Sequence, residues 1–171
     1  MQQISLVGYR ACGKSHIARM LARALSLPCI DADRYLENRI ESSISQLFSE
    51  QGEAVFRDWE ERCLAEILSQ CPAGILATGG GVVLRPANRA ALIRDGGLVV
   101  YLKAPAACLA QRLRRNCGNR PSLSGAHPAD EVASLLAQRE PWYQAVAGLV
   151  VDASGPAKQV MEQILAAYKG S

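Results

Sequence analysis

The sequence predicts an α/β fold of three layers, in which helices cover both faces of a central parallel sheet of five strands. Short apolar runs alternate along the chain with segments whose apolar residues recur at helical spacing, an order typical of a parallel sheet. The chain has 171 residues, of which 49% are hydrophobic, so it has the length of one domain and enough apolar side chains for a sizeable core. We therefore expect residues 1–171 to form a single domain.

The elements follow in order along the chain. The expected strands are the apolar runs at residues 4–7, 28–30, 74–78, 98–102 and 149–151. The first helix is "SHIARMLARAL", and a long helical region lies between the second and third strands, where Ser43 to Gln46 fits a capping box and apolar residues recur through 53–68. Helices opened by proline are expected over 105–115, 128–139 and 156–168.

The stretch "GYRACGKSH" joins the first strand to the first helix. Its spacing Gly8-x-x-x-x-Gly13-Lys14-Ser15 fits the phosphate-loop pattern, in which backbone N–H groups wrap the phosphates of a nucleotide. Lys14 would reach the β- and γ-phosphates, and Ser15 would bind Mg²⁺ at the start of a helix whose dipole favours anions. The alternative is that these residues form only a glycine turn before an ordinary helix. The strand before the pattern and the helix after it favour nucleotide binding.

Two aspartates, Asp31 and Asp33, follow the second strand. Ligands of open α/β sheets bind beyond the carboxyl ends of the strands, and residues two apart on an extended strand end project to one face. Asp31 is placed to anchor the magnesium ion, and Asp33 could accept a proton or a hydrogen bond from an acceptor hydroxyl. The alternative for either residue is that it only caps the next helix.

Three further features could serve the same site. The stretch "TGGG" at residues 78–81 is either a flexible turn or bare backbone that a small ligand or the γ-phosphate can approach closely. Arg57 in "VFRDWEE" and Arg139 in "AQREPWY" are either solvated arginines or a bidentate grip for a substrate carboxylate or phosphate. The stretch "NCGNRPSLSGAH" lacks core-facing periodicity, so we expect a mobile lid over about residues 112–127.

Charge and cysteine content argue against several classes of partner. The net charge of +3 is too small to indicate nucleic acid or a membrane surface, and the basic stretch Arg112, Arg114, Arg115 and Arg120 has no aromatic platforms beside it. The six cysteines form no C-x-x-C pair and only two histidines occur, which argues against a zinc site. We see neither a signal-like segment nor a run of about 18 apolar residues, and we expect a cytoplasmic protein with reduced thiols.

Six stretches, in this order and at these separations, resemble those of the shikimate kinases. They are "GYRACGKS", "DAD", "FRDWE", "ATGGG", "NRPSLSG" and "REPWY". The resemblance covers nearly the whole chain, including the tail "VVDASGP", and the lid segment is similar to the second of the two enterobacterial isoenzyme types. It implies a P-loop NTPase fold like that of the nucleoside monophosphate kinases. It also implies ATP-dependent phosphorylation of the 3-hydroxyl of shikimate, in the pathway to chorismate and the aromatic amino acids.

The resemblance also implies a role for each site residue. ATP phosphates would be held by the loop residues Ala11, Cys12, Gly13, Lys14, Ser15 and His16, with Mg²⁺ at Ser15 and Asp31. Arg112 would stack on adenine, and Arg120 of the lid would close onto the phosphates. Asp33 would bind the acceptor hydroxyls, Arg57 and Arg139 would grip the shikimate carboxylate, and Gly79, Gly80 and Gly81 would line the pocket. The helical region of about residues 33–61 would form the shikimate-binding part, and Lys14, Asp33 and Arg120 would carry catalysis.

Two departures from the family pattern concern the loop. Ala11 stands where the family usually has glycine, and if that position needs a positive φ, alanine costs about 1 kcal/mol. His16 replaces a serine or threonine that often meets a nucleotide phosphate, so we expect weaker ATP binding.

Two rival functions are a kinase for another small molecule, such as gluconate, and a non-enzymatic nucleotide switch. A GTPase would carry an N-K-x-D motif, which this sequence lacks. The expected partners are shikimate and ATP, and the expected state is a monomer.

Overall fold

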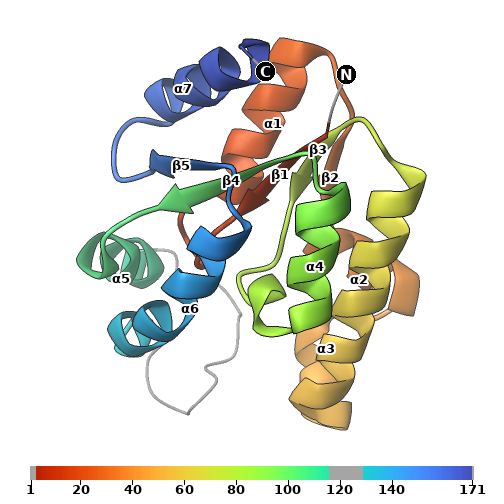
Figure 1. Ribbon diagram of the computed structural model, residues 1–171. Coiled ribbons are helices and arrows are strands. Elements are labelled where there is room, and N and C mark those ends of the chain that lie inside the picture. The colour runs from red at the N-terminus through yellow and green to blue at the C-terminus, as the bar shows by residue number, and fades with distance from the viewer. Residues whose placement is uncertain (1–2, 116–128, 171) are drawn as a thin grey trace.

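The computed structural model describes residues 3–115 and 129–170, and within them five strands form one sheet (Figure 1). The strands run parallel in the order β2-β3-β1-β4-β5, which confirms the predicted fold class. They are β1 (Ile4–Val7), β2 (Cys29–Asp31), β3 (Ile75–Ala77), β4 (Leu98–Lys103) and β5 (Leu149–Asp152). All four residues of β1 are buried because this strand lies at the centre of the sheet.

The helices cover both faces of the sheet. They are α1 (Lys14–Leu25), α2 (Ala32–Ile40), α3 (Ile44–Gln70), the 3₁₀ turn η1 (Val82–Leu84), α4 (Pro86–Asp95), α5 (Ala106–Arg115), α6 (Val132–Val146) and α7 (Ala157–Lys169). Helices α1 and α7 pack together on one face, while α3, α4 and α6 lie on the other (Figure 1). The chain leaves β1 for β2 at one edge and later crosses β1 to reach β4. The carboxyl end of β1 is therefore the switch point at which such sheets bind ligands.

Two parts of the helical prediction need correction. Helices α2 and α3 were predicted as one long helical region between the second and third strands, and helix α4, which follows β3, was not predicted. Helix α6 does not end near Arg139 but continues through Pro141 to Val146. A proline inside a helix costs about 3 kcal/mol. The residues after it, Tyr143 and Val146, are buried in the core, and their burial offsets that cost.

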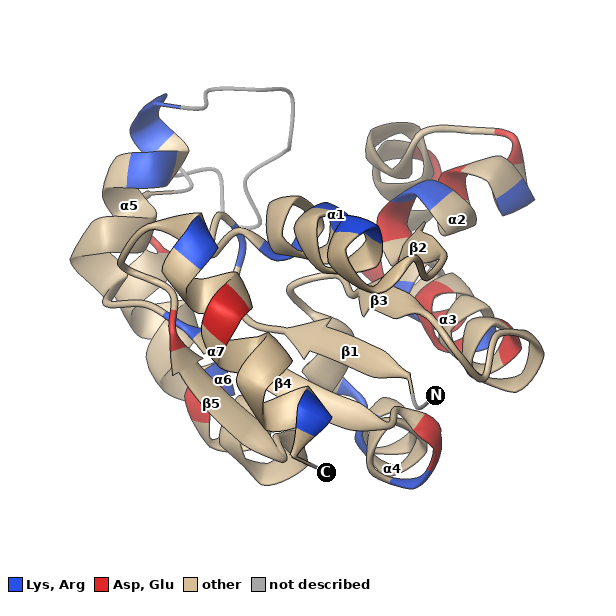
Figure 2. Cartoon of the chain, turned by 90° about the horizontal axis from the view of Figure 1, so that it is seen from above, with Lys and Arg blue, Asp and Glu red and all other residues tan. Residues whose placement is uncertain are grey.

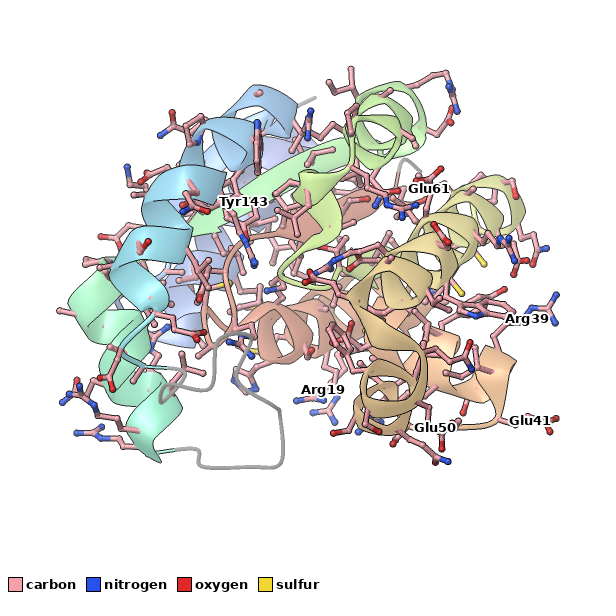
Figure 3. The ribbon with its side chains drawn as sticks, turned by 90° about the horizontal axis from the view of Figure 1, so that it is seen from below. Arg19, Arg39, Glu41, Glu50, Glu61 and Tyr143 are labelled. Atoms are coloured by element: carbon pink, nitrogen blue, oxygen red, sulfur yellow. The ribbon has the colours of Figure 1, made fainter. Side chains whose placement is uncertain are left out.

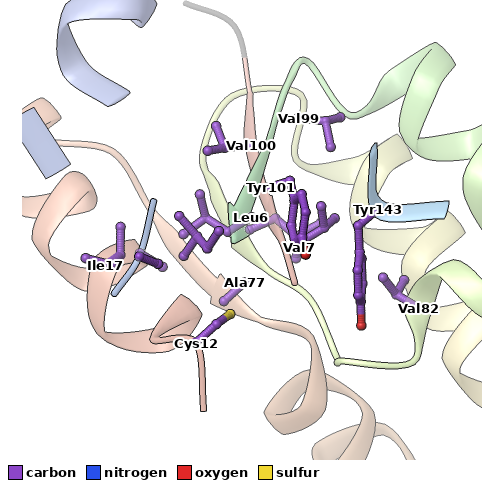
Figure 4. Packing of buried hydrophobic residues seen from close by; sticks show 14 of the residues in the cluster. Leu6, Val7, Cys12, Ile17, Ala77, Val82, Val99, Val100, Tyr101 and Tyr143 are labelled. Atoms are coloured by element: carbon purple, nitrogen blue, oxygen red, sulfur yellow. The ribbon is translucent and has the colours of Figure 1, made fainter. Parts of the chain in front are cut away.

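The buried side chains form two separate groups. The larger one packs the sheet against its flanking helices, and Figure 4 shows the part around Leu6, Tyr101 and Tyr143. The smaller one, which we call the α2–α3 cluster, consists of Leu36, Leu47, Phe56 and Cys63 with their partly buried neighbours. Helix α3 is kinked inside this region, because Gly52 has φ 82° and ψ 176°. The wall formed by α2 and α3 is thus packed largely by its own side chains.

The expected capping box at the start of α3 is half formed. The Ser43 hydroxyl accepts a hydrogen bond from the backbone N–H of Gln46 at 3.1 Å, as predicted. The Gln46 side chain does not reach back to Ser43. It bonds the side chains of Ser42 and Glu50 instead.

Charges of both signs are interspersed over α2 and α3, and a patch of basic residues lies at the end of α5 (Figure 2). Arg114 in that patch pairs with Asp130 at 3.2 Å, so the basic stretch has an acidic neighbour in space that the sequence order concealed. Among the described residues, no helix combines the length and the apolar composition that crossing a bilayer takes.

Candidate active site

The loop between β1 and α1 has the backbone conformations that its residues predict. Gly8 and Gly13 have φ values of 146° and 101°. A Cβ on Gly8 would lie 2.8 Å from the carbonyl oxygen of Leu102, so a side chain cannot be accommodated there. Ala11, which stands where the family usually has glycine, has φ 63° and therefore lies in the left-handed region. The anticipated strain of about 1 kcal/mol therefore applies to this position.

Lys14 lies across this loop and is largely buried. Its Nζ donates hydrogen bonds to the carbonyl oxygens of Gly8 at 2.8 Å and Tyr9 at 3.0 Å. Cys12 is buried beneath the loop, whereas His16 is exposed in the first turn of α1. The ammonium group and the helix N-terminus lie on the same loop, which is the arrangement that favours a polyphosphate.

Ser15 and Asp31 are joined directly. The Ser15 hydroxyl donates to Asp31 Oδ2 at 2.6 Å, while Asp31 Oδ1 accepts from the backbone N–H of Asp33 at 3.1 Å. Asp31 therefore caps α2, as the alternative interpretation predicts, and it also contacts the residue expected to bind magnesium. Its role as a magnesium anchor stays a prediction. The expectation that Asp33 continues an extended strand is wrong. Helix α2 begins at Ala32 and places Asp33 in its first turn.

A cavity of about 960 Å³ opens beside this end of the sheet. It brings together the predicted residues Asp31, Asp33, Arg57, Gly79, Gly80, Gly81 and Arg139. Its wall also contains residues that the sequence analysis did not select, namely Arg10, Arg34, Glu37, Ser43, Ile44, Ser45, Phe48, Phe56 and Glu60. Polar groups of both charges thus line one side of the cavity, and the rings from α3 supply an apolar surface.

Arg57 is held on the cavity wall by two acids of its own helix. Its Nη1 lies 2.8 Å from Glu60 Oε2, and its Nη2 lies 3.1 Å from Glu53 Oε1. Glu60 is buried, and burial raises the pKa of its carboxyl although the Arg57 charge opposes the shift. Sequence reasoning missed Glu60. Its position three residues after Arg57 on a helix was the available signal.

The backbone of Gly79, Gly80 and Gly81 lies close against side chains that line the cavity. A Cβ on Gly79 would lie 2.8 Å from Glu60 Oε1 and 3.0 Å from Asp33 Oδ1. A Cβ on Gly81 would overlap the guanidinium group of Arg57. Bare backbone is needed here because protein carboxylates and a guanidinium group press against it. The sequence had suggested close approach by the ligand itself.

Arg139 and Tyr143 reach the same loop from α6. Arg139 Nη1 lies 3.5 Å from the carbonyl oxygen of Gly80, and its guanidinium group lies 5.7 Å from the centre of the Tyr9 ring. The Tyr143 hydroxyl donates to the same Gly80 oxygen, and its ring stacks on Tyr101 with centroids 5.1 Å apart. Burial raises the pKa of Tyr143, so this hydroxyl stays a donor at neutral pH. Figure 3 shows Tyr143 pointing inward from α6, while Arg39, Glu41 and Glu50 lie at the periphery.

Arg112 connects the phosphate loop to the segment after β5. Its guanidinium group donates to the carbonyl oxygens of Ala11 at 3.3 Å and Ala153 at 2.8 Å. The arginine is therefore fixed beside the loop, on backbone carbonyls. Arg120 and nearly all of the expected lid, residues 116–127, lie outside the described residues.

Comparison with known proteins identifies the relatives of this chain. The family model for shikimate kinase matches residues 10–169. A shikimate kinase of Oleidesulfovibrio alaskensis is 44% identical over 96% of both chains. A shikimate kinase 2 of Yersinia enterocolitica is 40% identical over 96% of this chain and 94% of its own length.

A solved structure shares the whole fold. The shikimate kinase of Acinetobacter baumannii, in complex with shikimate, superimposes with a TM-score of 0.91 at 33% identity. It covers 99% of this chain and 94% of its own. The family model and these relatives span almost the full sequence, including the loop, the cavity wall and α6. The chain therefore belongs to the shikimate kinase family.

Proposed function

We propose that this chain transfers the terminal phosphoryl group of ATP to the 3-hydroxyl of shikimate. The observation that carries the proposal is the shared cavity in which Asp33, Arg57 and Arg139 face one space beside the phosphate loop. A carboxylated polyol needs cations for its carboxylate and an anionic acceptor for its hydroxyls. This cavity offers both, next to a loop suited to ATP.

The carboxylate of shikimate is assigned to Arg57 and Arg139. Both guanidinium groups are nearly buried, and each is fixed by neighbouring groups, Arg57 by its two acids and Arg139 by Gly80 and Tyr9. A buried, fixed arginine loses little freedom when it binds a carboxylate, and its charge-assisted hydrogen bonds are strong in a protected site. Asp33 in the first turn of α2 is assigned to the acceptor hydroxyls. Gly79, Gly80 and Gly81 complete the pocket wall, and residues 33–61 supply its helical side.

The phosphates of ATP are assigned to the loop from Ala11 to His16. The backbone N–H groups at the start of α1 and the Nζ of Lys14 supply the positive end of the site. Arg112 is assigned to the adenine end, and its hydrogen bonds to the carbonyl oxygens of Ala11 and Ala153 hold it beside the phosphate loop. His16 offers no hydroxyl, and its side chain is exposed, so we keep the expectation of weakened ATP binding.

A magnesium ion fits the donor set at Ser15 and Asp31. The two side chains present oxygen atoms 2.6 Å apart, and hard cations such as Mg²⁺ prefer oxygen ligands together with phosphates and water. In this assignment the phosphates of ATP and water supply the remaining ligands of the ion. When bound, the ion neutralises charge on the phosphates.

The transfer step requires mostly alignment and charge stabilisation. The bond between the γ-phosphorus and the bridging oxygen of ADP breaks as the bond to the 3-oxygen of shikimate forms. The proton of that hydroxyl passes to the Asp33 carboxylate, whose first task is to orient the hydroxyl. Lys14, and Arg120 from the sequence comparison, are assigned to the charge that moves to the leaving group.

A coupled assay for ADP release tests the proposal directly. The purified chain with Mg²⁺ and ATP is given shikimate or gluconate, and ADP is measured over time. Release that depends on shikimate supports the proposal. Release only with gluconate would identify another small-molecule kinase, and nucleotide binding without release to either acceptor would identify a nucleotide-binding module.

We further propose that the enzyme acts in the cytoplasm as a monomer, within aromatic amino acid biosynthesis. The described cysteines, Cys12, Cys29, Cys63, Cys71 and Cys108, are free thiols, which is typical of a reducing compartment.

A further inference from the structure

Arg10 belongs to the phosphate loop by sequence but contributes its side chain to the acceptor cavity. It stands two residues after Gly8 and directly after Tyr9, whose carbonyl oxygens hold the Nζ of Lys14. The stem of Arg10 packs on the bare backbone of Gly80, where an added Cβ would lie 3.2 Å from the arginine Cγ. Arg10 thus lies at the boundary between the nucleotide loop and the pocket assigned to shikimate.

The guanidinium group of Arg10 is incompletely satisfied. Its Nη2 is buried and has no hydrogen-bond partner in the described part of the chain. Arg57 in the same cavity is paired with Glu53 and Glu60, and Arg139 donates to Gly80. A buried donor without an acceptor costs free energy, so an anionic ligand that supplies the missing acceptor binds favourably.

The position of Arg10 indicates which anionic group it meets. Arg57 and Arg139 already account for the substrate carboxylate, and Asp33 accounts for the hydroxyls. The phosphoryl group is the remaining anion, and it crosses from the Lys14 side of the loop into the cavity at the boundary where Arg10 lies. We propose that Arg10 binds this phosphoryl group from the acceptor side, during transfer and afterwards as the phosphate ester of shikimate 3-phosphate. The inference rests on the proposed function and adds a catalytic residue to it.

The test compares the affinities for product and substrate. Arg10→Met keeps the stem that packs on Gly80 and removes the guanidinium group, while Arg10→Lys restores a positive charge. Affinities of each protein for shikimate and for shikimate 3-phosphate are measured by isothermal titration, and kcat and KM are measured in the coupled assay. Because the lost contact is a charge-assisted hydrogen bond, we expect Arg10→Met to bind shikimate 3-phosphate about 10- to 100-fold more weakly. Its affinity for shikimate should change less than about twofold.

The kinetic constants should show the same selectivity, with an effect on kcat and little effect on the shikimate KM. Arg10→Met should lower kcat at least about tenfold with the shikimate KM near that of the wild type, and Arg10→Lys should recover part of the loss. Arg34→Ala is the matched control, because it removes one positive charge from the same cavity. It should change both affinities by a similar factor.

The outcomes separate this inference from the proposed function. A wild-type chain that neither binds shikimate nor releases ADP with it would overturn both. An active wild type whose Arg10→Met variant weakens substrate and product equally would overturn the role of Arg10 alone. An equal, product-selective loss in Arg34→Ala would also overturn it, since the effect would then be general electrostatics. Thermal melting checks folding, and if Arg10→Met is unfolded, the Arg10→Lys comparison decides by the same two affinities.

Discussion

Gly81 lies directly against the guanidinium group of Arg57, so closely that a Cβ on Gly81 would overlap that group. The glycine and the arginine come from different elements, the loop after β3 and helix α3. Their contact fixes where the positive charge stands in the cavity.

Gly81→Ala should therefore raise the shikimate KM about tenfold or more, because the new methyl group displaces Arg57 from the acids that hold it. Nucleotide affinity should stay near that of the wild type. Steady-state kinetics and ADP titration measure the two effects. Gly148→Ala is the matched control, since a Cβ there meets atoms only at 3.8 Å. A Gly81→Ala enzyme with an unchanged KM would contradict the assigned position of Arg57.

Arg57→Ala and Arg139→Ala should each raise the shikimate KM by about 10- to 100-fold, since each removes charge-assisted hydrogen bonds to the carboxylate. Fluorescence titration with ADP should show affinity close to the wild type. Arg94→Ala, at an exposed arginine paired with its neighbour Asp95, is the control for loss of one surface charge. Lost ADP binding in either cavity variant would reassign that arginine to the nucleotide.

Glu60 should make stability depend on pH. Burial raises the pKa of this carboxyl above its ordinary value near 4.5, so the folded protein holds the proton more tightly than the unfolded chain does. At pH values between the ordinary pKa and the raised pKa of Glu60, this carboxyl binds more protons in the folded state than in the unfolded state. The free energy of unfolding must therefore fall as the pH rises through this range. Relative to Glu60→Gln, the wild type should lose stability from about pH 4.5 upward until the raised pKa is passed. Urea denaturation at a series of pH values measures this, with Glu41→Gln as the control for loss of one acidic charge. A constant difference between wild type and Glu60→Gln at all pH values would contradict the direction of the shift.

Ala11→Gly should stabilise the protein by up to about 1 kcal/mol, because glycine relieves the left-handed backbone at φ 63°. The gain is reduced by the greater freedom of glycine in the unfolded chain. Ala65→Gly, at an exposed position inside α3, should have the opposite sign and cost about 1 kcal/mol. Chemical denaturation compares the two. Equal destabilisation by both substitutions would show that the loop backbone is not strained at this residue.

Arg120→Ala should lower kcat by about 10³-fold or more, as removal of a phosphate-neutralising arginine generally does in phosphoryl transfer. This prediction rests on the "NRPSLSG" motif, since the residue lies outside those that the structure describes. Steady-state kinetics checks it. A variant with nearly wild-type kcat and a raised KM alone would remove Arg120 from the transition state.

The sequence predicted the sheet and the phosphate loop well because both are local patterns. Apolar runs and the Gly-x-x-x-x-Gly-Lys-Ser spacing depend on neighbours in the chain, and all five strands occur within a few residues of their predicted positions. The proximity of Asp31 and Ser15 was also anticipated, since both residues follow strands at the carboxyl edge of the same parallel sheet.

The helix ends and site residues that were not predicted depend on contacts between segments distant in the sequence. The start of α2 at Ala32 follows from the cap at Asp31, and sequence alone left strand and cap as alternatives. The continuation of α6 past Pro141 depends on burial of Tyr143, which propensity cannot reveal. Tyr143 and Arg10 were missed for the same reason, whereas the spacing of Glu60 from Arg57 on one helix was a local signal for that residue. Their roles appear only when the Gly79–Gly81 backbone is seen pressed from several sides.

The α2–α3 cluster has a practical consequence for engineering. Leu36, Leu47, Phe56 and Cys63 form a cluster separate from the main core in the wall that we assign to the acceptor, and Gly52 separates the two halves of α3. A library that varies this wall as one block can therefore explore new acceptor molecules while the ATP-handling half keeps its own packing. Inhibitors that wedge between these helices would likewise act on acceptor choice and leave the common nucleotide machinery, which many other kinases share, untouched.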